Sequence, residues 1–152
     1  MLKKQELKII VDNREKKPLW TSGTIIKRLE TGDYSISING ESLEKKICIE
    51  RKNGIDLFNT LSKGHARFNK EINRSKELEY FAIVIENSYE DLLNKRFKGS
   101  FYTKMKGHVT IAILLTIHMK YETPIFFTNS RKESRSLIKE LFKTYIRKTK
   151  TL

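Results

Sequence analysis

The chain has 152 residues, of which 38% are hydrophobic and 32% are charged. This length favours a single domain that buries a core of its own. The sequence has no run of about 18 consecutive apolar residues, so we expect neither a membrane span nor a membrane partner. Lys and Arg number 31 against 18 Asp and Glu, a net charge of +13, which favours a polyanionic partner and nucleic acid above all.

The N-terminus and the cysteine content indicate an intracellular protein. The basic start MLKKQELKII leads directly into a strand-like run and lacks the apolar region of a signal peptide. The single cysteine, Cys48, cannot form an intramolecular disulfide and is expected to be a small core residue in a strand. We therefore expect a protein of the cytoplasm or nucleoid. Its many Lys, Ile and Asn residues fit an AT-rich genome, bacterial, viral or prophage.

The first third of the chain is predicted to be mostly extended. The apolar run before Asp12 predicts a strand over residues 7–12, and a loop followed by a helix is expected from Pro18 to Glu30. Two strands are expected over residues 34–38 and 44–51. Asn39-Gly40 lies between them, and this pair is typical of a tight hairpin turn.

The remaining chain alternates predicted helices and strands. In order, we expect helices over 55–62 and 65–79, a strand over 80–86, helices over 89–95 and 108–120, and a strand over 124–128. Ser130 with Glu133 three residues later is typical of a capping box, so a final helix should begin there. The continuously apolar strand YFAIVIE should be central. Such alternation is typical of an α/β fold with a mixed sheet.

Two carboxylates and a lysine form the pattern that carries chemistry. Asp33 follows Gly32 in a turn, whereas Glu50 and Lys52 stand two residues apart on a predicted strand. Residues i and i+2 of a strand point to the same face, so Glu50 and Lys52 should project together and Arg51 away from them. A carboxylate that can hold a divalent metal, beside a cation, suits metal-assisted hydrolysis of a phosphodiester.

This pattern resembles the nuclease domain of the XPF/Mus-type structure-specific endonucleases. The family signature is GD, a variable spacer, ERK, three residues and D, and the chain meets it from Gly32-Asp33 through Glu50-Arg51-Lys52 to Asp56. The upstream VDNRE and the downstream GHARFNKEINR are also similar, so the resemblance covers about residues 7–147. It implies a restriction-endonuclease-like sandwich, with a central mixed β-sheet flanked by helices, and endonuclease activity on branched or structured DNA such as flaps, forks or junctions.

The resemblance also implies the catalytic residues, which are Asp12, Glu15, Asp33, Glu50, Arg51, Lys52 and Asp56. Asp33 and Glu50 are the expected first ligands of Mg²⁺ or Mn²⁺, and Asp12 and Glu15 are expected as further metal ligands or as groups that orient water. Because four close carboxylates would repel one another, at least one of them should have a raised pKa in the absence of metal.

Each of the other signature residues has two possible roles. Lys52 should stabilise developing charge or position the nucleophile. Arg51 either pairs with a carboxylate or reaches a phosphate from the flank. Asp56 either hydrogen-bonds the N-terminus of a helix or acts directly in the site.

Two further segments are expected to contact DNA. Lys63, Arg67, Lys70 and Arg74 follow helical spacing and would track a phosphate backbone, the alternative being an ordinary solvated face, and His65 at the start of this helix could also touch DNA. In residues 95–108, Tyr102, Lys104 and Lys106 belong to an interleaving of aromatic and basic residues. Such aromatics either stack on unpaired bases or pin the loop to the core.

The resemblance leaves three matters open. The helix over 108–120 is apolar nearly all round and is either a core helix or a dimer interface, so the chain could form a homodimer or pair with a DNA-binding partner. We expect residues 1–152 to be one nuclease domain without a helix-hairpin-helix domain. The rival functions are a non-catalytic DNA-binding subunit and a nuclease that acts on ordinary duplex DNA.

Overall fold

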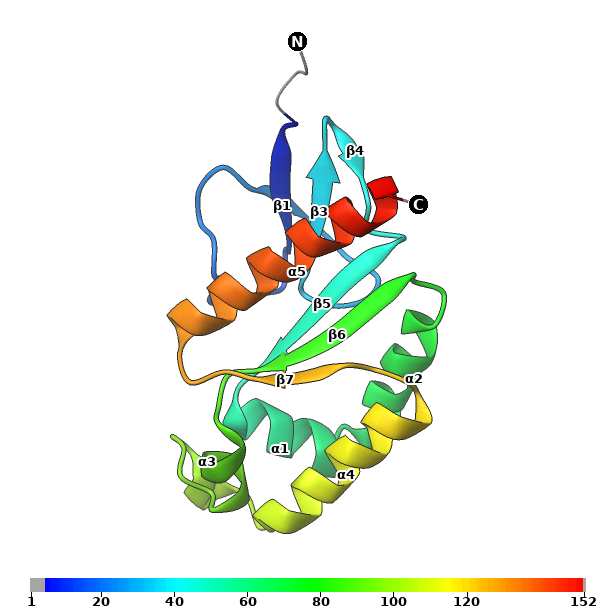
Figure 1. Cartoon of the computed structure of the whole chain (residues 1–152). Helices are drawn as coiled ribbons and strands as arrows, with labels where there is room; N and C mark the ends of the chain where they lie inside the picture. The colour runs from blue at the N-terminus through cyan, green and yellow to red at the C-terminus, as the bar shows by residue number, and fades with distance from the viewer. Residues whose placement is uncertain (1–4, 152) are drawn as a thin grey trace.

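The computed structural model describes residues 5–151 and has a single mixed β-sheet at its centre (Figure 1). The seven strands are β1 Leu7–Asp12, β2 Ile25–Lys27, β3 Tyr34–Ile38, β4 Glu41–Ser42, β5 Ile47–Lys52, β6 Tyr80–Ile85 and β7 Ile125–Phe127. Their order across the sheet is β2-β1-β3-β5-β6-β7, with β4 paired to β3. Strand β3 runs antiparallel to both β1 and β5, whereas β5, β6 and β7 run parallel to one another.

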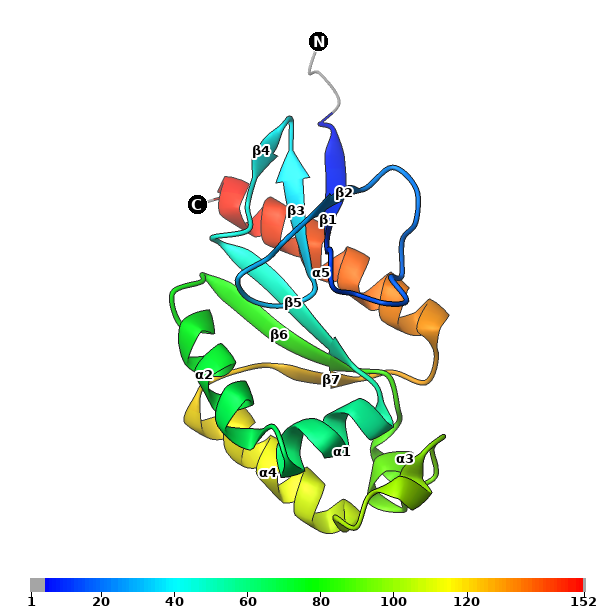
Figure 2. The ribbon, with the colours of Figure 1, turned by 180° about the vertical axis from the view of Figure 1, so that it is seen from behind.

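Helices cover both faces of this sheet. They are α1 Gly54–Ser62, α2 His65–Ser75, α3 Tyr89–Leu93, α4 Gly107–Lys120 and α5 Arg131–Thr151, with a 3₁₀ turn, η1, at Ser100–Tyr102. The long helix α5 crosses the face that is turned toward the viewer in Figure 1, and α1, α2 and α4 cover the other face, which Figure 2 shows from behind. The predicted α/β sandwich with a mixed sheet is confirmed.

Each face of the sheet buries its own apolar core. On one face Ile138 and Phe142 of α5 pack against strands β1, β3, β5 and β6. On the other face Phe58 of α1, Ile72 of α2 and Leu114 of α4 pack against β5 and β6. Burial of apolar surface on both faces, at about 25 cal/mol per Å², is the main term that holds the layers together.

The alternation of side chains along β5 determines which layer each of its residues faces. Ile47 and Ile49 belong to the core under α5, whereas Cys48 belongs to the core under α1 and α2. The prediction that Cys48 is a buried core residue is confirmed. Burial raises the pKa of its thiol to about 12. By the same alternation Glu50 and Lys52 face the α1–α2 layer, and Arg51 faces the opposite side.

The prediction of a helix between Pro18 and Glu30 is wrong. Residues 25–27 form β2, which pairs in parallel with Ile10, Val11 and Asp12 of β1, and the flanking residues are irregular. The run Thr24-Ile25-Ile26 is β-branched, and such side chains favour a strand over a helix. Gly23 precedes it with φ of +66°, a backbone conformation that does not occur inside a helix.

Two smaller expectations also change. Asn39-Gly40 does form a tight turn, with φ of 50° and 84°, but it joins β3 to the short β4, and β5 begins only at Ile47. Strand β6 is buried from Phe81 to Ile85 but lies next to the end of the sheet, while β3 and β5 occupy the middle. Within residues 5–151, no helix has both the length and the apolar character that crossing a membrane requires.

Candidate active site

The pairing of β3 with β5 brings the two halves of the GD…ERK pattern together. Tyr34 of β3 is opposite Ile49 of β5, so Asp33 and Glu50 are adjacent across the sheet. The main-chain N–H of Asp33 donates to the Ile49 carbonyl at 2.8 Å, and Asp33 Oδ2 accepts the main-chain N–H of Arg51 at 2.7 Å. Asp33 is therefore fixed by the backbone of the strand that carries Glu50.

Gly32 is the residue that makes this approach possible. Its φ is +78°, and a Cβ placed on it would lie 3.0 Å from the Ile49 carbonyl oxygen and 3.2 Å from the Cys48 Cβ. A side chain at position 32 would therefore strain the turn and push β3 away from β5. The glycine of the GD pair thus has a structural role next to Asp33.

Glu50 and Lys52 project together, as the strand periodicity predicted. Lys52 Nζ lies 3.6 Å from Glu50 Oε1, and Glu50 is only 5% exposed. Arg51 points to the other side, where its guanidinium forms two hydrogen bonds with the carboxylate of Glu86, at 3.2 and 3.1 Å, and donates to the Lys17 carbonyl at 3.0 Å. Of the two roles considered for Arg51, pairing with a carboxylate is the one that the structure has.

The electrostatics of the site are strained in the metal-free chain. Burial, reinforced by the charge of Glu15, raises the pKa of Asp33 to about 7. Burial, together with the charges of Asp33 and Glu71, raises the pKa of Glu50 well above its ordinary value. Burial alone would lower the pKa of Lys52, but the neighbouring carboxylates, Glu50 first, outweigh it and raise that pKa. The prediction that at least one acid has a raised pKa is confirmed.

Glu71 of α2 is a site residue that the sequence analysis did not identify. Its Oε1 accepts the main-chain N–H of Gly32 at 3.3 Å, and its carboxyl group is within hydrogen-bonding reach of Glu50. One feature of the sequence could have identified Glu71: it is the single acid in the basic helix HARFNKEINRS, and it stands next to the buried Ile72. An acid beside the apolar face of an amphipathic helix is placed to face the sheet.

The two upstream acids occupy different positions. Asp12 is buried, and its carboxylate accepts the Arg14 Nε–H at 2.9 Å and the Leu29 main-chain N–H at 2.8 Å. These contacts hold the irregular loop after β1, so Asp12 has a structural function whatever its part in catalysis. Glu15 lies nearer the site, with Oε2 3.8 Å from Arg51 Nη1, and its charge acts on Asp33.

The acids present suit a hard cation that keeps part of its water shell. Among the described residues, no three His, Cys, Asp or Glu side chains lie close enough to hold a metal ion by themselves. Mg²⁺ and Mn²⁺ sites of nucleic-acid enzymes need only one or two carboxylates, completed by water and substrate phosphate. Asp33 and Glu50 provide that pair, and the raised pKa of each shows the negative charge that a cation would relieve.

Asp56 lies in the first turn of α1, directly after strand β5. Asn53 caps this helix, and its Oδ1 accepts the main-chain N–H of Asp56 at 3.1 Å. The Asp56 side chain is exposed, and its charge contributes to the raised pKa of Lys52. Asp56 thus favours both the N-terminus of the helix and the cationic form of Lys52.

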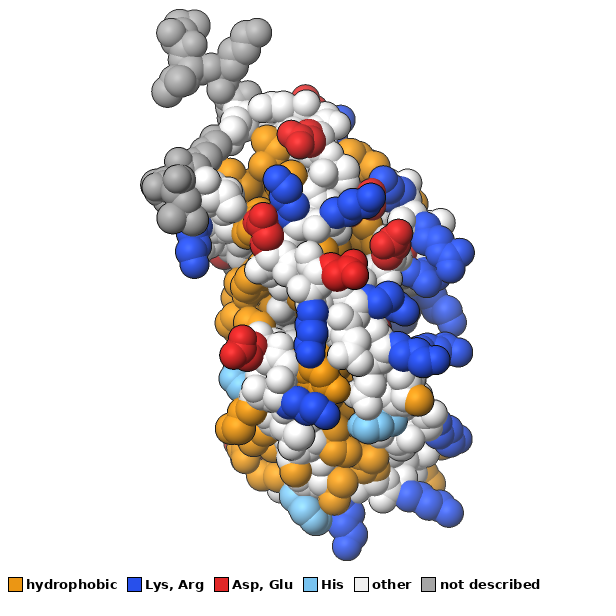
Figure 3. All heavy atoms as spheres, turned by 90° about the vertical axis from the view of Figure 1, so that its right-hand side faces the viewer, with side chains coloured by type: hydrophobic (Ala, Val, Ile, Leu, Met, Phe, Trp, Pro, Cys, Tyr) orange, Lys and Arg blue, Asp and Glu red, His pale blue; other side chains and the backbone are white. Residues whose placement is uncertain are grey.

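The four predicted phosphate-binding cations are all exposed. Arg67, Lys70 and Arg74 lie on α2 away from its buried Phe68, whereas Lys63 lies just before the helix. In Figure 3, Lys and Arg side chains line the margin that turns toward the view of Figure 2, the side on which α1 and α2 lie. Most of this basic surface lies on α2, the helix that also carries Glu71.

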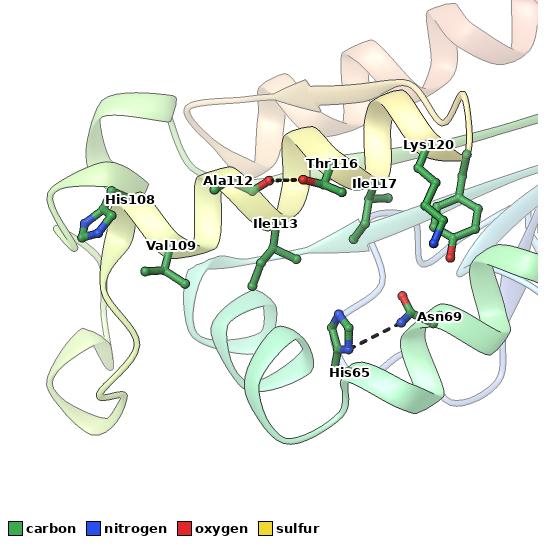
Figure 4. A pocket seen from close by; sticks show the side chains of 10 residues that line it. His65, Asn69, His108, Val109, Ala112, Ile113, Thr116, Ile117 and Lys120 are labelled. Atoms are coloured by element: carbon green, nitrogen blue, oxygen red, sulfur yellow. Dashed lines mark hydrogen bonds between the residues drawn. The ribbon is translucent and has the colours of Figure 1, made fainter.

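His65 lies on another side of α2 from those cations. It lines a groove of about 400 Å³ between α2 and α4, where it points toward Ile113 and lies 3.4 Å from the Asn69 amide nitrogen (Figure 4). The opposite wall, α4, packs Leu114 into the core but leaves Leu115 and Met119 exposed, the latter by 74%. Helix α4 is therefore part core helix and part uncovered apolar surface.

The comparisons with known proteins agree with this geometry. The ERCC4 domain model matches residues 10–141. XPF from Aeropyrum pernix is 23% identical with a TM-score of 0.65, over 91% of this chain and 61% of that one. The same protein in complex with DNA is 21% identical with a TM-score of 0.68, over 93% and 66%. This chain thus spans less than two thirds of the XPF chains.

No curated protein is significantly similar in sequence. The match to the family model nevertheless covers most of the chain, and the likeness to XPF confirms the predicted restriction-endonuclease-like fold. The pairing of β3 with β5 brings Asp33 and Glu50 of the GD…ERK pattern together, whereas the Arg51 side chain points to the other face of the sheet. The chain therefore belongs to the ERCC4 domain family, and its fold is that of XPF.

Proposed function

We propose that this protein is a divalent-metal-dependent DNA endonuclease that cuts branched or structured DNA. The observation that carries the proposal is the convergence of Asp33 and Glu50, two carboxylates with raised pKa values, beside the cation of Lys52. A structural ion pair would need only one acid. A second buried acid within the same site is costly to the fold unless a cation joins it, which favours function over structure.

Each residue of the site has a chemical task in this proposal. Asp33 and Glu50 would hold the metal, Mg²⁺ or Mn²⁺. When bound, it would supply a positive charge against the scissile phosphate and a bound water of lowered pKa. Lys52, held near Glu50, would stabilise the charge that develops on the phosphate in the transition state. Arg51 and Glu86 keep β5 and the loop at Lys17 in place, and Glu15 adds negative charge next to Asp33.

DNA is the proposed substrate because a basic surface adjoins this site. The exposed cations of α2 would contact phosphates on either side of the scissile bond without reading the sequence. The similar Aeropyrum pernix XPF has been captured in a complex with DNA. Such an enzyme would serve DNA repair or recombination.

We further propose that the uncovered face of α4 is where a second subunit binds. Helix α4 exposes the apolar side chains of Val109, Leu115 and Met119. Contact of such apolar surface with water is unfavourable. A homodimer or a heterodimer with a DNA-binding subunit would bury it, and such a partner could contribute the choice of DNA structure. We infer that the nuclease centre itself lies wholly within one chain.

Cleavage of a panel of labelled DNAs tests the function. Flap, fork, four-way junction, single-stranded and linear duplex DNAs are incubated with the protein in Mg²⁺, in Mn²⁺ and in EDTA. We expect cutting of the branched DNAs with either metal and none in EDTA. Glu50→Gln, purified in parallel, should remove the activity and thereby exclude a contaminating nuclease.

The same panel separates the rival functions. Tight DNA binding without cleavage in either metal would identify a non-catalytic subunit. Equal cutting of linear duplex and branched DNA would identify an ordinary duplex nuclease. The intact Asp33, Glu50 and Lys52 favour catalysis over the first rival.

A further inference from the structure

The loop between α3 and α4 presents two aromatic side chains to solvent. Phe101 and Tyr102, in the 3₁₀ turn η1, are 95% and 86% exposed, the highest values among the large apolar side chains described. Their rings meet edge to face with centroids 6.2 Å apart. Exposure of aromatic rings to water is unfavourable, so their placement at the tip of a loop indicates a binding role.

This loop is firmly braced despite its exposed tip. Phe97 packs its ring on Phe58 of α1, with centroids 4.9 Å apart, and Lys95 Nζ donates to the Thr103 carbonyl across the base of the loop at 2.6 Å. Gly99 has φ of +87° and approaches Ile55 so closely that a Cβ would lie 3.3 Å from it. Phe97 is thus the aromatic residue that pins the loop to the core, which leaves Phe101 and Tyr102 without that role.

The bracing also ties the tip to the catalytic strand. The Phe97 ring covers Gly54, where a Cβ would lie only 2.5 Å from it, and Gly54 is two residues after Lys52. Both ribbon views show the η1 segment beside the first turn of α1, which begins where β5 ends (Figures 1 and 2). A molecule that sits on the tip is therefore held in a fixed relation to the site.

The charge around the tip identifies the kind of molecule that fits it. Lys98, Lys104 and Lys106 are exposed, and among the side chains that the structure describes none of the three has a carboxylate partner. Aromatic rings with free cations beside them suit a ligand that combines flat apolar faces with negative charges. Unpaired nucleotides have both, whereas in a duplex the base faces are already stacked.

We infer that Phe101 and Tyr102 form a stacking platform for the unpaired bases of a branched DNA, next to the nuclease centre. The inference rests on the proposed function for its choice of DNA as ligand, and it names the feature of the substrate that this chain recognises. The flanking lysines hold the sugar-phosphate chain while the rings accept the bases. Preference for a single-strand extension over plain duplex then arises within this chain.

The test measures binding without cleavage. Affinity is determined in EDTA for a fork with one unpaired arm, for a blunt duplex, and for a fork whose unpaired arm carries abasic sites. The abasic arm keeps every phosphate but offers no face for stacking. The wild type should bind the normal fork about 5- to 150-fold more tightly than the abasic fork, the range expected for stacking of one base.

Matched variants assign that difference to the rings. Tyr102→Leu should lose most of the preference for the normal fork, Tyr102→Phe should keep it, and Phe101→Leu should behave as Tyr102→Leu does. None should alter duplex affinity or thermal stability, because both side chains are almost fully exposed. A fluorescent base analogue in the arm should be quenched by the wild type and not by Tyr102→Leu.

Two outcomes would overturn the inference. Equal affinity of the wild type for normal and abasic forks would show that the rings do not stack on bases. A change in the association state of the Leu variants, with fork affinity intact, would make the tip a protein contact instead. Because binding is measured without metal, a chain that prefers the normal fork but never cuts DNA would refute the proposed endonuclease and leave the platform standing.

Discussion

The carboxylate of Asp33 accepts the main-chain N–H of Arg51 at 2.7 Å. Because Arg51 stands between Glu50 and Lys52 in the chain, this bond holds Asp33 next to both of them. The Arg51 side chain meanwhile binds Glu86 on the far side of the sheet. One residue thus joins the face that carries Glu50 and Lys52 to the opposite face of the sheet. Substitution of Arg51 alters its side-chain contacts but leaves the bond to Asp33 available, because the donor is the main chain.

The first prediction concerns the protonation of Asp33. Its raised pKa means that, in the absence of metal, the folded state keeps a proton between about pH 4 and pH 7 that the unfolded chain has lost. This contribution to stability is fully present below about pH 4 and disappears as the pH rises through about 7. Asp33→Asn should therefore be more stable than the wild type at pH 8 in EDTA, and the two should converge near pH 4.

Thermal unfolding from pH 4 to pH 8 measures this difference. Mg²⁺ should raise the melting temperature of the wild type at pH 8 and have little effect on Asp33→Asn, because the substitution removes a proposed ligand. A stability difference that is independent of pH would show that Asp33 is ordinarily ionised in the folded state.

The second prediction separates the chemistry of Lys52 from binding. Its charge should act on the transition state more than on the bound substrate. Lys52→Ala should lower the single-turnover rate at saturating DNA by about 100-fold or more, the usual cost of losing one charge-stabilising group. Lys52→Arg, which keeps a cation, should recover part of the rate. A loss confined to DNA affinity would make Lys52 a phosphate clamp.

The third prediction concerns Glu71, which shares the site with Glu50 and accepts the Gly32 N–H. Glu71→Gln removes its charge but keeps an acceptor for that N–H. Metal affinity should fall by about 10-fold, as expected for a group that supports a metal ligand. Calorimetric titration with Mn²⁺ measures this directly. Glu77→Gln, an exposed acid just beyond α2, is the matched control and should bind Mn²⁺ as the wild type does.

The fourth prediction tests the basic surface of α2. Each phosphate contact on duplex DNA contributes about −0.9 to the slope of log affinity against log salt. Arg67→Ala with Lys70→Ala should weaken every DNA in the panel similarly and flatten the slope by about two contacts' worth. The cut position should not change, because phosphate contacts carry no sequence information.

The opposite face of the sheet supplies the control for this prediction. Lys132 and Lys139 of α5 are also exposed, so their double replacement by alanine removes the same charge from a surface remote from α2. This variant should keep the wild-type slope. If both double variants flattened the salt-dependence slope equally, overall charge rather than the α2 surface would determine binding.

The sequence predicted those parts of the fold whose signals are local. Strand alternation in ICIERK placed Glu50 and Lys52 on one face, and Asn39-Gly40 marked its turn, because each depends on a few neighbouring residues. The strand β2 was missed because three residues make too short a pattern, and only pairing with β1 gives them their structure. Pairing between strands that are distant in sequence cannot be predicted from either strand alone.

The same division applies to the candidate site. The GD…ERK spacing indicated Asp33, Glu50 and Lys52, which the structure brings together, although their catalytic roles stay predictions. Glu71 was missed because it reaches the site from α2, at a sequence position that no motif connects to it. Glu86, which binds Arg51 on the other side of the sheet, was missed for the same reason, since it follows the end of β6. Asp12 remains a predicted site residue, but its contacts with Arg14 and Leu29 could not be anticipated from spacing.

The buried thiol of Cys48 has a practical consequence. Burial and a pKa near 12 leave almost no reactive thiolate at neutral pH, so this natural cysteine should be silent toward maleimide reagents. A cysteine introduced at Lys132 would then be the only residue to take a dye. Doubly labelled samples of protein and DNA could report by energy transfer which arm of a branched substrate lies over which face, without any need to remove the native cysteine.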